Sequence, residues 1–283
     1  MKINESYGPW ALITGASSGI GEQFARQLSE QGLNLVLVAR RESVLNVLAR
    51  ELTDEFGINV VVVAADLATD VGRNAVKKAA DELEIGLLIN NAGVEQSGSF
   101  FRYTSRETTQ LVDLNVTAPV DLAHHFGRQM VSRGRGGILF VASALGYQGV
   151  PWYANYAASK ATLVNLAESL HYELKPLGVD VLALSPGITH TPMAERLNSD
   201  TNFASIGLRA LSPRYVARVG LRNLGRRATV VPGIQYKAFG WMTKWLLPRS
   251  TSAWMFGKLM SRAFRNKSAM SPIGNTVATA GTP

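Results

Sequence analysis

A tyrosine and a lysine lie four positions apart in the segment Tyr156-Ala157-Ala158-Ser159-Lys160, and Ser143 lies thirteen residues before the tyrosine. In a helix, residues i and i+4 share one face, so Tyr156 and Lys160 would be neighbours. An ammonium group beside a phenol favours the phenolate and lowers a pKa that is normally about 10. Such a pair could transfer a proton near neutral pH. Because this spacing also arises by chance, its value as evidence for a proton-transfer site depends on what else the sequence contains.

A glycine-rich segment, Gly15-Ala16-Ser17-Ser18-Gly19-Ile20-Gly21, follows the apolar run 9–14 and precedes a helical pattern. A strand, a turn and a helix start in this order offer free backbone N–H groups and the positive end of the helix dipole to a phosphate. Gly15 would permit the tight turn, Gly19 would let a pyrophosphate approach the backbone, and Gly21 would let helix and strand pack closely. The spacing G-x-x-x-G-x-G differs from the commoner G-x-G-x-x-G fingerprint, and a merely flexible glycine loop is the alternative.

Further short motifs follow in a fixed order along the chain. They are Asp66, Asn90-Asn91-Ala92-Gly93, Asn115, Ser143, Tyr156-x-x-x-Lys160 and Pro186-Gly187, after Thr14-Gly15-x-x-x-Gly19-x-Gly21. On these residues, the chain resembles the short-chain dehydrogenase/reductase family, of the single-domain, NADP(H)-preferring type, from about Pro9 to Gly233. The resemblance implies an α/β fold with a Rossmann-type doubly wound parallel sheet, oxidoreductase activity and a homodimer or homotetramer.

The resemblance also implies roles for the catalytic residues. Tyr156 would be the general acid in carbonyl reduction and the general base in alcohol oxidation. Lys160 would lower the pKa of Tyr156 and bind the nicotinamide ribose. Ser143 would donate a hydrogen bond to the substrate oxygen, and Asn115, inside a predicted helix 104–133, would hold a water that links Lys160 to solvent. The alternatives are a simple turn residue for Ser143 and an incidental polar residue for Asn115.

A larger set is implied in cofactor binding. Asp66 would contact the adenine edge, or would instead cap the next helix. The segment 188–191 would close over the nicotinamide, with backbone contacts from Thr189 and a hydroxyl from Thr191. The full set is Gly15, Ser17, Ser18, Gly19, Ile20, Gly21, Arg40, Arg41, Asp66, Leu67, Asn91, Ala92, Gly93, Tyr156, Lys160, Pro186, Gly187, Thr189 and Thr191.

The end of the second predicted strand bears on which nicotinamide cofactor binds. An NAD-preferring site places a carboxylate there, on the ribose hydroxyls, where it would repel a 2′-phosphate. Ala39 occupies that position, and Arg40 and Arg41 follow. Guanidinium groups pair well with phosphate, so the sequence favours NADP(H). Against this, Ser18 stands where many such enzymes carry a basic residue, and the arginines could simply be a solvated helix start.

Apolar runs alternate with helical patterns along most of the chain, which predicts a parallel sheet with helices on both faces. Strands are predicted near 10–14, 33–38, 58–64, 87–90, 137–142, 179–184 and 228–231. Helices are predicted near 19–31, 41–56, 69–83, 104–133, 153–177 and 213–226. Thr104 to Glu107 has the pattern of a capping box, and Ser212-Pro213 that of an N-cap followed by proline.

The composition excludes several kinds of site. The 283 residues include no cysteine, so disulfides, zinc–thiolate sites and thiol catalysis are excluded. His124, His125, His171 and His190 form no ligand pattern, and no metal site is expected. No apolar run approaches the roughly 18 residues that span a bilayer. The short polar start shows no secretory signal, so a cytoplasmic protein is expected.

Charge is distributed unevenly. After Glu195 the chain carries fourteen Lys and Arg but one acidic residue, Asp200, which gives +13 there and −5 in the remainder of a chain with net charge +8. A basic half could indicate nucleic-acid binding. The chain has no recognised nucleic-acid motif, and the basic residues alternate with large apolar ones, so no nucleic acid is expected.

The predicted catalytic domain covers residues 1–233, with a substrate loop at about 188–212, and an extension follows. Residues 234–266 combine basic and large apolar residues, which predicts two amphipathic helices broken at Pro248. Such helices could lie at the surface of an anionic membrane, cap a pocket, or pack on the protein's own core or a second subunit. The expected substrate is a hydrophobic ketone or alcohol, lipid-like, acyl or sterol-like. Residues 267–283 are expected to be disordered.

Three other functions fit parts of the sequence. An enzyme with the same fold and cofactor could perform epimerisation or dehydration. A nucleotide-sensing protein would bind the cofactor with little turnover, and a membrane-surface protein would function mainly through residues 234–266. The intact set of Ser143, Tyr156 and Lys160 favours redox chemistry.

Overall fold

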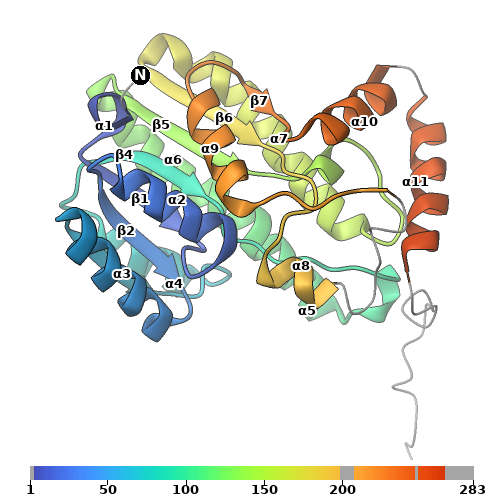
Figure 1. Cartoon of the computed structure of the whole chain (residues 1–283), viewed down its shortest axis with the longest axis horizontal. Helices are drawn as coiled ribbons and strands as arrows, with labels where there is room; N and C mark the ends of the chain where they lie inside the picture. Colours follow the sequence, from blue (N-terminus) through green and yellow to red (C-terminus); the bar gives the residue numbers. More distant parts are fainter. Residues whose placement is uncertain (1–2, 198–206, 246–247, 265–283) are drawn as a thin grey trace, which may run out of the picture.

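The computed structural model describes residues 3–197, 207–245 and 248–264. Its centre is a seven-stranded sheet in the order β3-β2-β1-β4-β5-β6-β7, with every neighbouring pair parallel (Figure 1). The strands are β1 Trp10–Thr14, β2 Asn34–Ala39, β3 Val60–Ala64, β4 Ile85–Asn90, β5 Gly136–Val141, β6 Val179–Leu184 and β7 Thr229–Val230. The predicted doubly wound fold is confirmed, and each strand lies within two residues of its predicted bounds.

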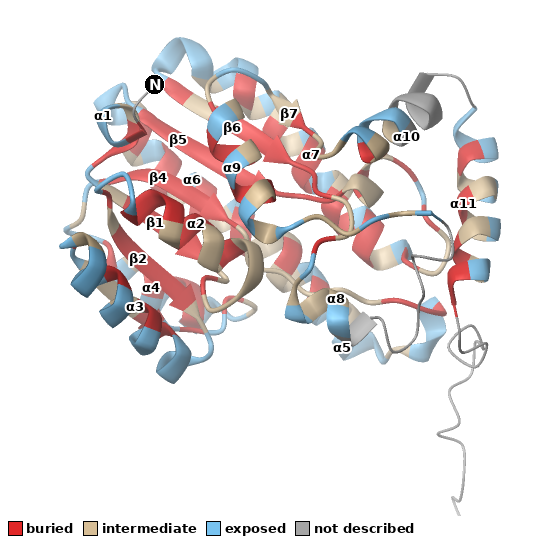
Figure 2. Ribbon diagram, viewed as in Figure 1, coloured by how far each residue is buried: buried red, intermediate tan, exposed pale blue. Residues whose placement is uncertain are grey.

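Helices cover both faces of the sheet (Figure 1). One face carries α2 Gly19–Ser29, α3 Glu42–Phe56 and α9 Pro213–Asn223, and the other carries α4 Asp70–Ala79, α6 Ala118–Arg133 and α7 Ala154–Leu174. A parallel sheet is buried on both faces, which is why its strands are continuous apolar runs. Figure 2 shows the strands buried and the outer side of α3 exposed.

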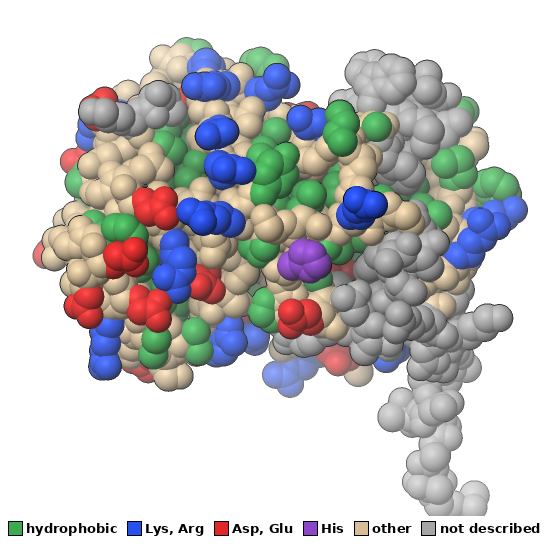
Figure 3. Space-filling view, viewed as in Figure 1, with side chains coloured by type: hydrophobic (Ala, Val, Ile, Leu, Met, Phe, Trp, Pro, Cys, Tyr) green, Lys and Arg blue, Asp and Glu red, His purple; other side chains and the backbone are tan. Residues whose placement is uncertain are grey.

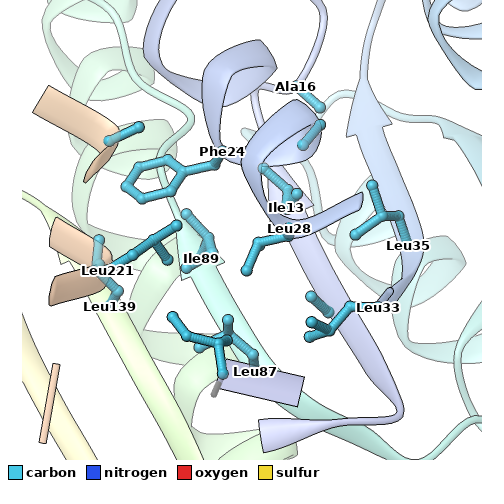
Figure 4. Close-up of a cluster of buried hydrophobic side chains, with 14 of the residues drawn as sticks. Ile13, Ala16, Phe24, Leu28, Leu33, Leu35, Leu87, Ile89, Leu139 and Leu221 are labelled. Atoms are coloured by element: carbon cyan, nitrogen blue, oxygen red, sulfur yellow. The ribbon is translucent and has the colours of Figure 1, made fainter. Parts of the chain in front are cut away.

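Alternate residues of the strands pack into two separate hydrophobic cores, one on each face of the sheet. Leu35, Leu87, Ile89 and Leu139 pack with Phe24 and Leu28 of α2 on one face (Figure 4). Their strand neighbours, such as Leu88 and Phe140, pack against α6 and α7 on the other face. This period-two alternation fixes the register of each strand, because a slip of one residue would exchange the two faces.

The predicted continuous helix 104–133 is interrupted. Helix α5 spans Ser105–Val112, a π-helical turn spans Asp113–Thr117, and α6 follows at Ala118. The predicted capping box at Thr104 and Glu107 is present, and Ser212 caps α9 ahead of Pro213 as predicted. The helical period alone gave no sign of the π-turn, which depends on contacts made by its own side chains.

Short helices lie outside the predicted set. They are α1 Ile3–Tyr7, α8 Pro192–Leu197 and the 3-10 turns Phe100–Arg102, Ala144–Tyr147 and Lys175–Leu177. The extension forms α10 Ile234–Trp245 and α11 Arg249–Ala263, and Pro248 is the residue before α11. The two predicted helices are therefore present. The tail 267–283, whose disorder was predicted, and positions 198–206 of the substrate loop lie outside the described residues.

The uneven charge has a spatial counterpart. On the face shown in Figure 3, Lys and Arg side chains gather over α9, whereas Asp and Glu gather over α2 and α3. Helix α9 carries Arg214, Arg218 and Arg222. Across the ranges 3–197, 207–245 and 248–264, no helix is long and apolar enough to cross a membrane.

Candidate active site

The tyrosine–lysine pair lies in the first two turns of α7. Tyr156 and Lys160 are both buried, and the Lys160 ammonium lies 5.8 Å from the centre of the Tyr156 ring. The ammonium Nζ donates a 2.8 Å hydrogen bond to the backbone carbonyl of Val141, at the end of β5. The helical spacing predicted from sequence therefore brings the two side chains together, and the sheet fixes the lysine end.

Ser143 lies two residues after the end of β5, at the same carboxyl edge of the sheet. Its backbone is extended, its side chain is buried, and its hydroxyl lies within hydrogen-bonding reach of the Tyr156 phenol. The neighbouring residues Ala142 and Ala144 donate backbone hydrogen bonds to Leu184 and Pro186 at the end of β6. These bonds hold the serine between two strand ends, where ligands bind in open α/β sheets.

Burial shapes the acidity of this group of side chains. It raises the pKa of Tyr156 above its usual value, the charge of Glu95 raises it further, and the hydrogen bond with Ser143 opposes both. Burial lowers the pKa of Lys160 to about 8, an effect that Glu95 opposes. The sequence predicts that Lys160 lowers the pKa of Tyr156. In the cofactor-free chain, burial and Glu95 outweigh any such effect, because a charged phenolate is poorly solvated there.

Asn115 lies in the π-helical turn and is fully buried. Its amide Nδ2 donates hydrogen bonds to the Val94 carbonyl at 2.8 Å and to the Ser159 hydroxyl at 3.1 Å, while its Oδ1 accepts from the Val94 N–H at 2.9 Å. Ser159 in turn donates to the Tyr156 carbonyl at 2.7 Å. Asn115 thus links the segment after β4 to α7.

The glycine-rich turn has the geometry of a phosphate cradle. Gly15 and Gly19 have positive φ angles of 66° and 62°, a conformation that favours glycine. A Cβ on Gly21 would lie 2.3 Å from the Gly15 carbonyl oxygen, which explains the glycine at the close approach of helix and strand. The start of α2 leaves its first N–H groups facing this turn.

Asn91 secures the turn from the neighbouring strand. Its side-chain amide donates to the carbonyls of Thr14 at 2.9 Å and Gly15 at 3.2 Å, and the Thr14 hydroxyl accepts from the N–H groups of Asn91 and Ala92 at 2.9 Å. Gly93 lies beside the Tyr156–Lys160 pair, since a Cβ on it would be 3.4 Å from the Lys160 ammonium. The segment 91–93 therefore joins the glycine-rich turn to the Tyr156–Lys160 pair.

Arg41 reaches across this turn. Its guanidinium donates to the Ser17 hydroxyl at 2.9 Å, the Ser17 carbonyl at 3.2 Å and the Ser18 hydroxyl at 3.2 Å. Arg40 is exposed beside it. The Arg41 guanidinium and two hydroxyls thus lie together where β2 ends and α3 begins.

Asp66 does not cap α4, contrary to one of the two alternatives. The N-cap is Thr69, which accepts a hydrogen bond from Gly72. The exposed Asp66 carboxylate accepts from the Ala68 N–H at 3.1 Å within its own turn, and Leu67 is buried beneath it. The carboxylate lies at the end of β3, on the same edge of the sheet as the glycine-rich turn.

The segment after β6 folds back over the glycine-rich turn. A Cβ on Gly19 would lie 2.9 Å from the Thr191 methyl group, and Thr189 is buried, with a parallel bridge to Leu211. A Cβ on Gly187 would lie 2.2 Å from the Tyr236 ring of α10. The Tyr236 hydroxyl donates to the Arg209 carbonyl at 3.0 Å, so the extension contacts both described parts of the loop.

An apolar cluster surrounds Tyr156. Helix α11 contributes Phe256 and Met260, which share this cluster with Tyr156 and other buried residues: Leu111, Val150, Tyr153, Ala157 and Phe264. Pro151 and Trp152 lie in the loop before α7, and Pro151 is close enough to Gly257 that a Cβ there would be 3.1 Å away. Trp152 has a φ of 70°, rare for a residue with a side chain, which marks a strained loop beside the site.

Sequence analysis missed one site residue, Glu95. It lies two positions after Gly93, is half-buried, and interacts electrostatically with both Tyr156 and Lys160. Burial raises the pKa of its carboxyl to about 8, against the opposing effect of Lys160. The signal in the sequence is slight: an acidic residue directly after a run of small and apolar ones. Among the described residues, no group of three His, Asp or Glu could hold a metal ion.

Comparisons with known proteins agree with this geometry. Residues 9–202 match the family model described as short chain dehydrogenase. The 7beta-hydroxysteroid dehydrogenase of Collinsella aerofaciens is 30% identical over 84% of this chain and 90% of its own length. A very-long-chain 3-oxoacyl-CoA reductase of Phaeosphaeria nodorum is 37% identical over 69% of this chain and 60% of its own.

Solved structures show the same similarity. A 7beta-hydroxysteroid dehydrogenase structure superposes with a TM-score of 0.84 at 28% identity, over 90% of this chain and 99% of that one. A short-chain dehydrogenase from Sphingobium yanoikuyae, in complex with NADPH, gives a TM-score of 0.74 at 33% identity, over 84% of this chain and 95% of the other.

Proposed function

Since the chain belongs to the short chain dehydrogenase family and is an oxidoreductase acting on CH–OH groups, we propose that it interconverts a hydrophobic ketone and its secondary alcohol with NADP(H). The observation that carries this proposal is the assembly of Ser143, Tyr156 and Lys160 at one edge of the sheet, beside the glycine-rich turn. The similar proteins are named as dehydrogenases and reductases, which favours simple redox chemistry over epimerisation or dehydration.

The residues at the turn fit a dinucleotide. Positive φ angles at Gly15 and Gly19 and the open start of α2 provide a cradle for a pyrophosphate. Arg40, Arg41 and the hydroxyls of Ser17 and Ser18 suit a 2′-phosphate, since guanidinium groups form bidentate hydrogen bonds with phosphate. Asp66 would face the adenine. The bound NADPH of a similar structure supports the same preference.

The residues of the chain would handle the proton and orient the carbonyl. Tyr156 would donate its phenolic proton to the oxygen of the ketone, and Ser143 would hold that oxygen by a second hydrogen bond. Lys160, anchored on Val141, would bind the nicotinamide ribose and stabilise the phenolate that remains. When bound, the cofactor would supply the hydride, and the positive charge of its oxidised ring would oppose the raised pKa of Tyr156.

A hydrophobic substrate is supported by the surroundings of the tyrosine. Phe256 and Met260 of α11 pack into the cluster that includes Tyr156, so the extension contributes apolar surface beside the reacting group. The similar hydroxysteroid and 3-oxoacyl-CoA enzymes carry names of large apolar substrates. We therefore favour a sterol-like or long acyl ketone, with α10 and α11 as one wall of the pocket.

Two further contacts belong to this proposal. A homodimer or homotetramer would form through α5, α6 and α7, whose outer faces expose Val112, Val120 and Tyr172. A peripheral contact with an anionic membrane would use α11, where Lys258 lies 3.9 Å from the ring centre of the exposed Trp254. The buried apolar side of α11 packs against the protein itself, which favours the wall over the membrane contact.

The test begins with cofactor binding. The purified protein is titrated with NADPH and NADH, and nicotinamide absorbance is then followed with a steroid ketone, a 3-oxoacyl thioester and a bulky aryl ketone. Tighter binding of NADPH and oxidation by one ketone class are expected. Absence of binding to either nucleotide would contradict the proposal, and turnover of small polar ketones alone would contradict its substrate class.

A further inference from the structure

We propose that Gln235 and Tyr236, in the first turn of α10, are positioning residues that hold the segment 187–191 over the cofactor site and thereby slow the release of NADPH. The inference rests on the proposed function, because it gives the C-terminal extension a part in retaining the cofactor of that reaction. It adds two residues that lie beyond the motifs of the first 233 positions.

The segment 187–191 runs between the two ends of the proposed cofactor site. At its start, the Ala144 N–H donates a 2.9 Å hydrogen bond to the Pro186 carbonyl, in the turn that follows β5. At its end, the Thr191 methyl group lies against Gly19, where an added Cβ would be 2.9 Å away. A dinucleotide with its pyrophosphate at the glycine-rich turn and its reacting ring near the end of β5 would therefore have this segment along its nicotinamide half.

Backbone pairing ties this segment to residues 209–211. The Leu211 N–H donates to the Ile188 carbonyl at 2.8 Å, and the His190 N–H donates to the Leu211 carbonyl at 2.9 Å. Thr189, between them, forms a parallel bridge with Leu211. This pairing lies beyond the end of β6, so the position of 187–191 depends on that of 209–211 and not on the sheet alone.

Helix α10 holds residues 209–211 through one backbone carbonyl. The Tyr236 hydroxyl donates to the Arg209 carbonyl at 3.0 Å, and the Gln235 side-chain amide donates to the same oxygen at 2.6 Å. A carbonyl oxygen has two lone pairs, so these two donors can occupy both. Loss of one donor leaves the other in place, whereas loss of both removes the two hydrogen bonds between Arg209 and α10.

Tyr236 also contacts the start of the segment directly. Its side chain is buried, and its ring lies so close to the backbone at Gly187 that a Cβ there would be 2.2 Å away. One tyrosine therefore covers Gly187 with its ring and holds residues 209–211 with its hydroxyl. The two contacts can be separated by experiment, because phenylalanine keeps the ring and removes the hydroxyl.

The first turn of α10 is itself anchored to the sheet. Strand β7 pairs with β6, and Gly233, three residues after β7, has a positive φ of 82° where the chain turns into the helix. The Lys237 N–H donates to the Gly233 carbonyl at 3.1 Å, and a Cβ on Gly233 would lie 3.2 Å from the Leu211 side chain. Movement of 187–191 away from the cofactor site would therefore break either its pairing with 209–211 or the bonds to Arg209.

The first test measures release of the cofactor. NADPH dissociation is followed by its fluorescence in a stopped-flow chase with excess NADP⁺, for wild type and for the double variant Gln235→Leu/Tyr236→Phe. The dissociation rate constant should rise by about three- to thirtyfold, the usual worth of one to two hydrogen bonds. Tyr236→Phe alone should give a smaller rise, because Gln235 still donates to Arg209. An unchanged rate constant in the double variant would overturn the proposal.

A nucleotide without nicotinamide distinguishes positioning from a general loss of structure. Adenosine 2′,5′-bisphosphate carries the adenosine and the 2′-phosphate of NADPH but lacks the half along which 187–191 would run. Its Kd should be the same for the double variant and for wild type. Equal weakening of this nucleotide and of NADPH would overturn the proposal, since α10 would then support the whole site and not the segment.

Tyr215→Phe is the matched control. It removes the same hydroxyl from a tyrosine of α9, whose ring lies 5.9 Å from the Arg218 guanidinium. Its rate constant for NADPH dissociation should equal that of wild type. A rise as large as that of Tyr236→Phe would show that the effect does not depend on the bond to Arg209, and would also overturn the proposal.

A second test needs no nucleotide. Hydrogen exchange, measured by mass spectrometry on peptides that cover 187–191 and 209–211, should be faster in the double variant than in wild type, because the N–H groups of His190 and Leu211 form the pairing that α10 supports. Unchanged exchange would refute the role of α10. If the double variant does not fold, Tyr236→Phe takes its place in both tests.

The outcomes separate this inference from the proposed function. Failure of wild type to bind NADPH would refute the proposed function and this inference with it. Binding of NADPH by wild type, with unchanged release from the variants, would refute only the positioning role of Gln235 and Tyr236.

Discussion

The Lys160 ammonium donates a 2.8 Å hydrogen bond to the carbonyl of Val141, two residues before Ser143. This bond crosses from α7 to the end of β5 and joins the two elements that carry the catalytic side chains. A lysine anchored in this way keeps its position relative to Ser143 while its charge acts on Tyr156 and on a bound ribose. The variants below test where these side chains lie separately from the proton transfer and cofactor binding that they are proposed to perform.

Removal of the phenolic hydroxyl should abolish turnover without removing the cofactor. In Tyr156→Phe, kcat for ketone reduction should fall by about 10²- to 10⁴-fold, the usual contribution of a general acid. The Kd for NADPH, measured by fluorescence titration, should change little. Tyr153→Phe is the control, since Tyr153 is buried in the same cluster but has Ala157, not lysine, four positions later. Wild-type activity in Tyr156→Phe would refute the mechanism.

Loss of the two arginines should affect NADPH far more than NADH. The double variant Arg40→Ala/Arg41→Ala should weaken NADPH binding by about ten- to hundredfold, because hydrogen bonds to a charged phosphate are lost. NADH has no 2′-phosphate, so its Kd should move much less. Arg50→Ala removes an exposed arginine from the same helix α3 and should alter neither Kd. Equal weakening of the two nucleotides by the double variant would remove the phosphate assignment.

A methyl group at position 187 should destabilise the chain through Tyr236. The new Cβ would lie 2.2 Å from the Tyr236 ring, and overpacking of this kind costs about 1–3 kcal/mol. Gly187→Ala should therefore lower the midpoint of thermal unfolding in the absence of cofactor. Gly240→Ala, in α10 and with nothing within 4 Å of the new Cβ, should not. Tyr236→Ala should relieve most of the penalty, and a persistent penalty would place the clash elsewhere.

Glu95→Gln should stabilise the cofactor-free protein in a pH-dependent way. The folded chain holds the Glu95 proton up to a pKa of about 8, against 4.5 in an unconstrained glutamate, so wild type loses stability as the pH rises from the lower to the higher value. The full linkage is about 5 kcal/mol, which partial exposure to solvent reduces to about 1–3 kcal/mol. Urea unfolding should show this gain above pH 8 and its disappearance towards the lower pKa. A pH-independent difference would contradict the raised pKa.

Assembly should depend on the outer face of α6. Val120→Asp places a charge on an exposed apolar position of that helix, where a subunit interface is expected, and should reduce the mass measured by light scattering. Val71→Asp makes the same change on α4, which is outside the expected interface, and should leave the mass unaltered. A monomeric wild type would refute the expected oligomer directly.

Local rules account for what the sequence predicted well. Apolar runs bounded by turns located every strand, and side-chain chemistry located the caps at Thr104 and Ser212. The pair Tyr156 and Lys160 needed only the helical repeat to be placed together. In each case the determining residues lie within a few positions of one another.

Contacts distant in sequence account for what was missed. Glu95 joins the site because Asn115, twenty residues later, holds its neighbour Val94. The restraint on Gly187 comes from Tyr236, on a helix that begins after the last strand. The sequence left a helix cap open as the alternative role of Asp66, and the turn geometry excludes it, because Thr69 caps α4. The helical and strand periodicities of a single sequence carry no information on such contacts between distant residues.

The π-helical turn at 113–117 also limits how this region can change length. A π-turn accommodates one residue more than an α-helix would over the same path. Deletion of one residue there would turn the segment into continuous α-helix and keep the helix beyond it in nearly the same phase, whereas the same deletion in a regular helix rotates everything beyond it by about 100°. Ala118, Leu122 and Phe126 would then still face the sheet that buries them. Between residues 105 and 133, the π-turn is therefore the place where loss of one residue disturbs the α6 core least, and the contacts of Asn115 are what such a deletion puts at risk.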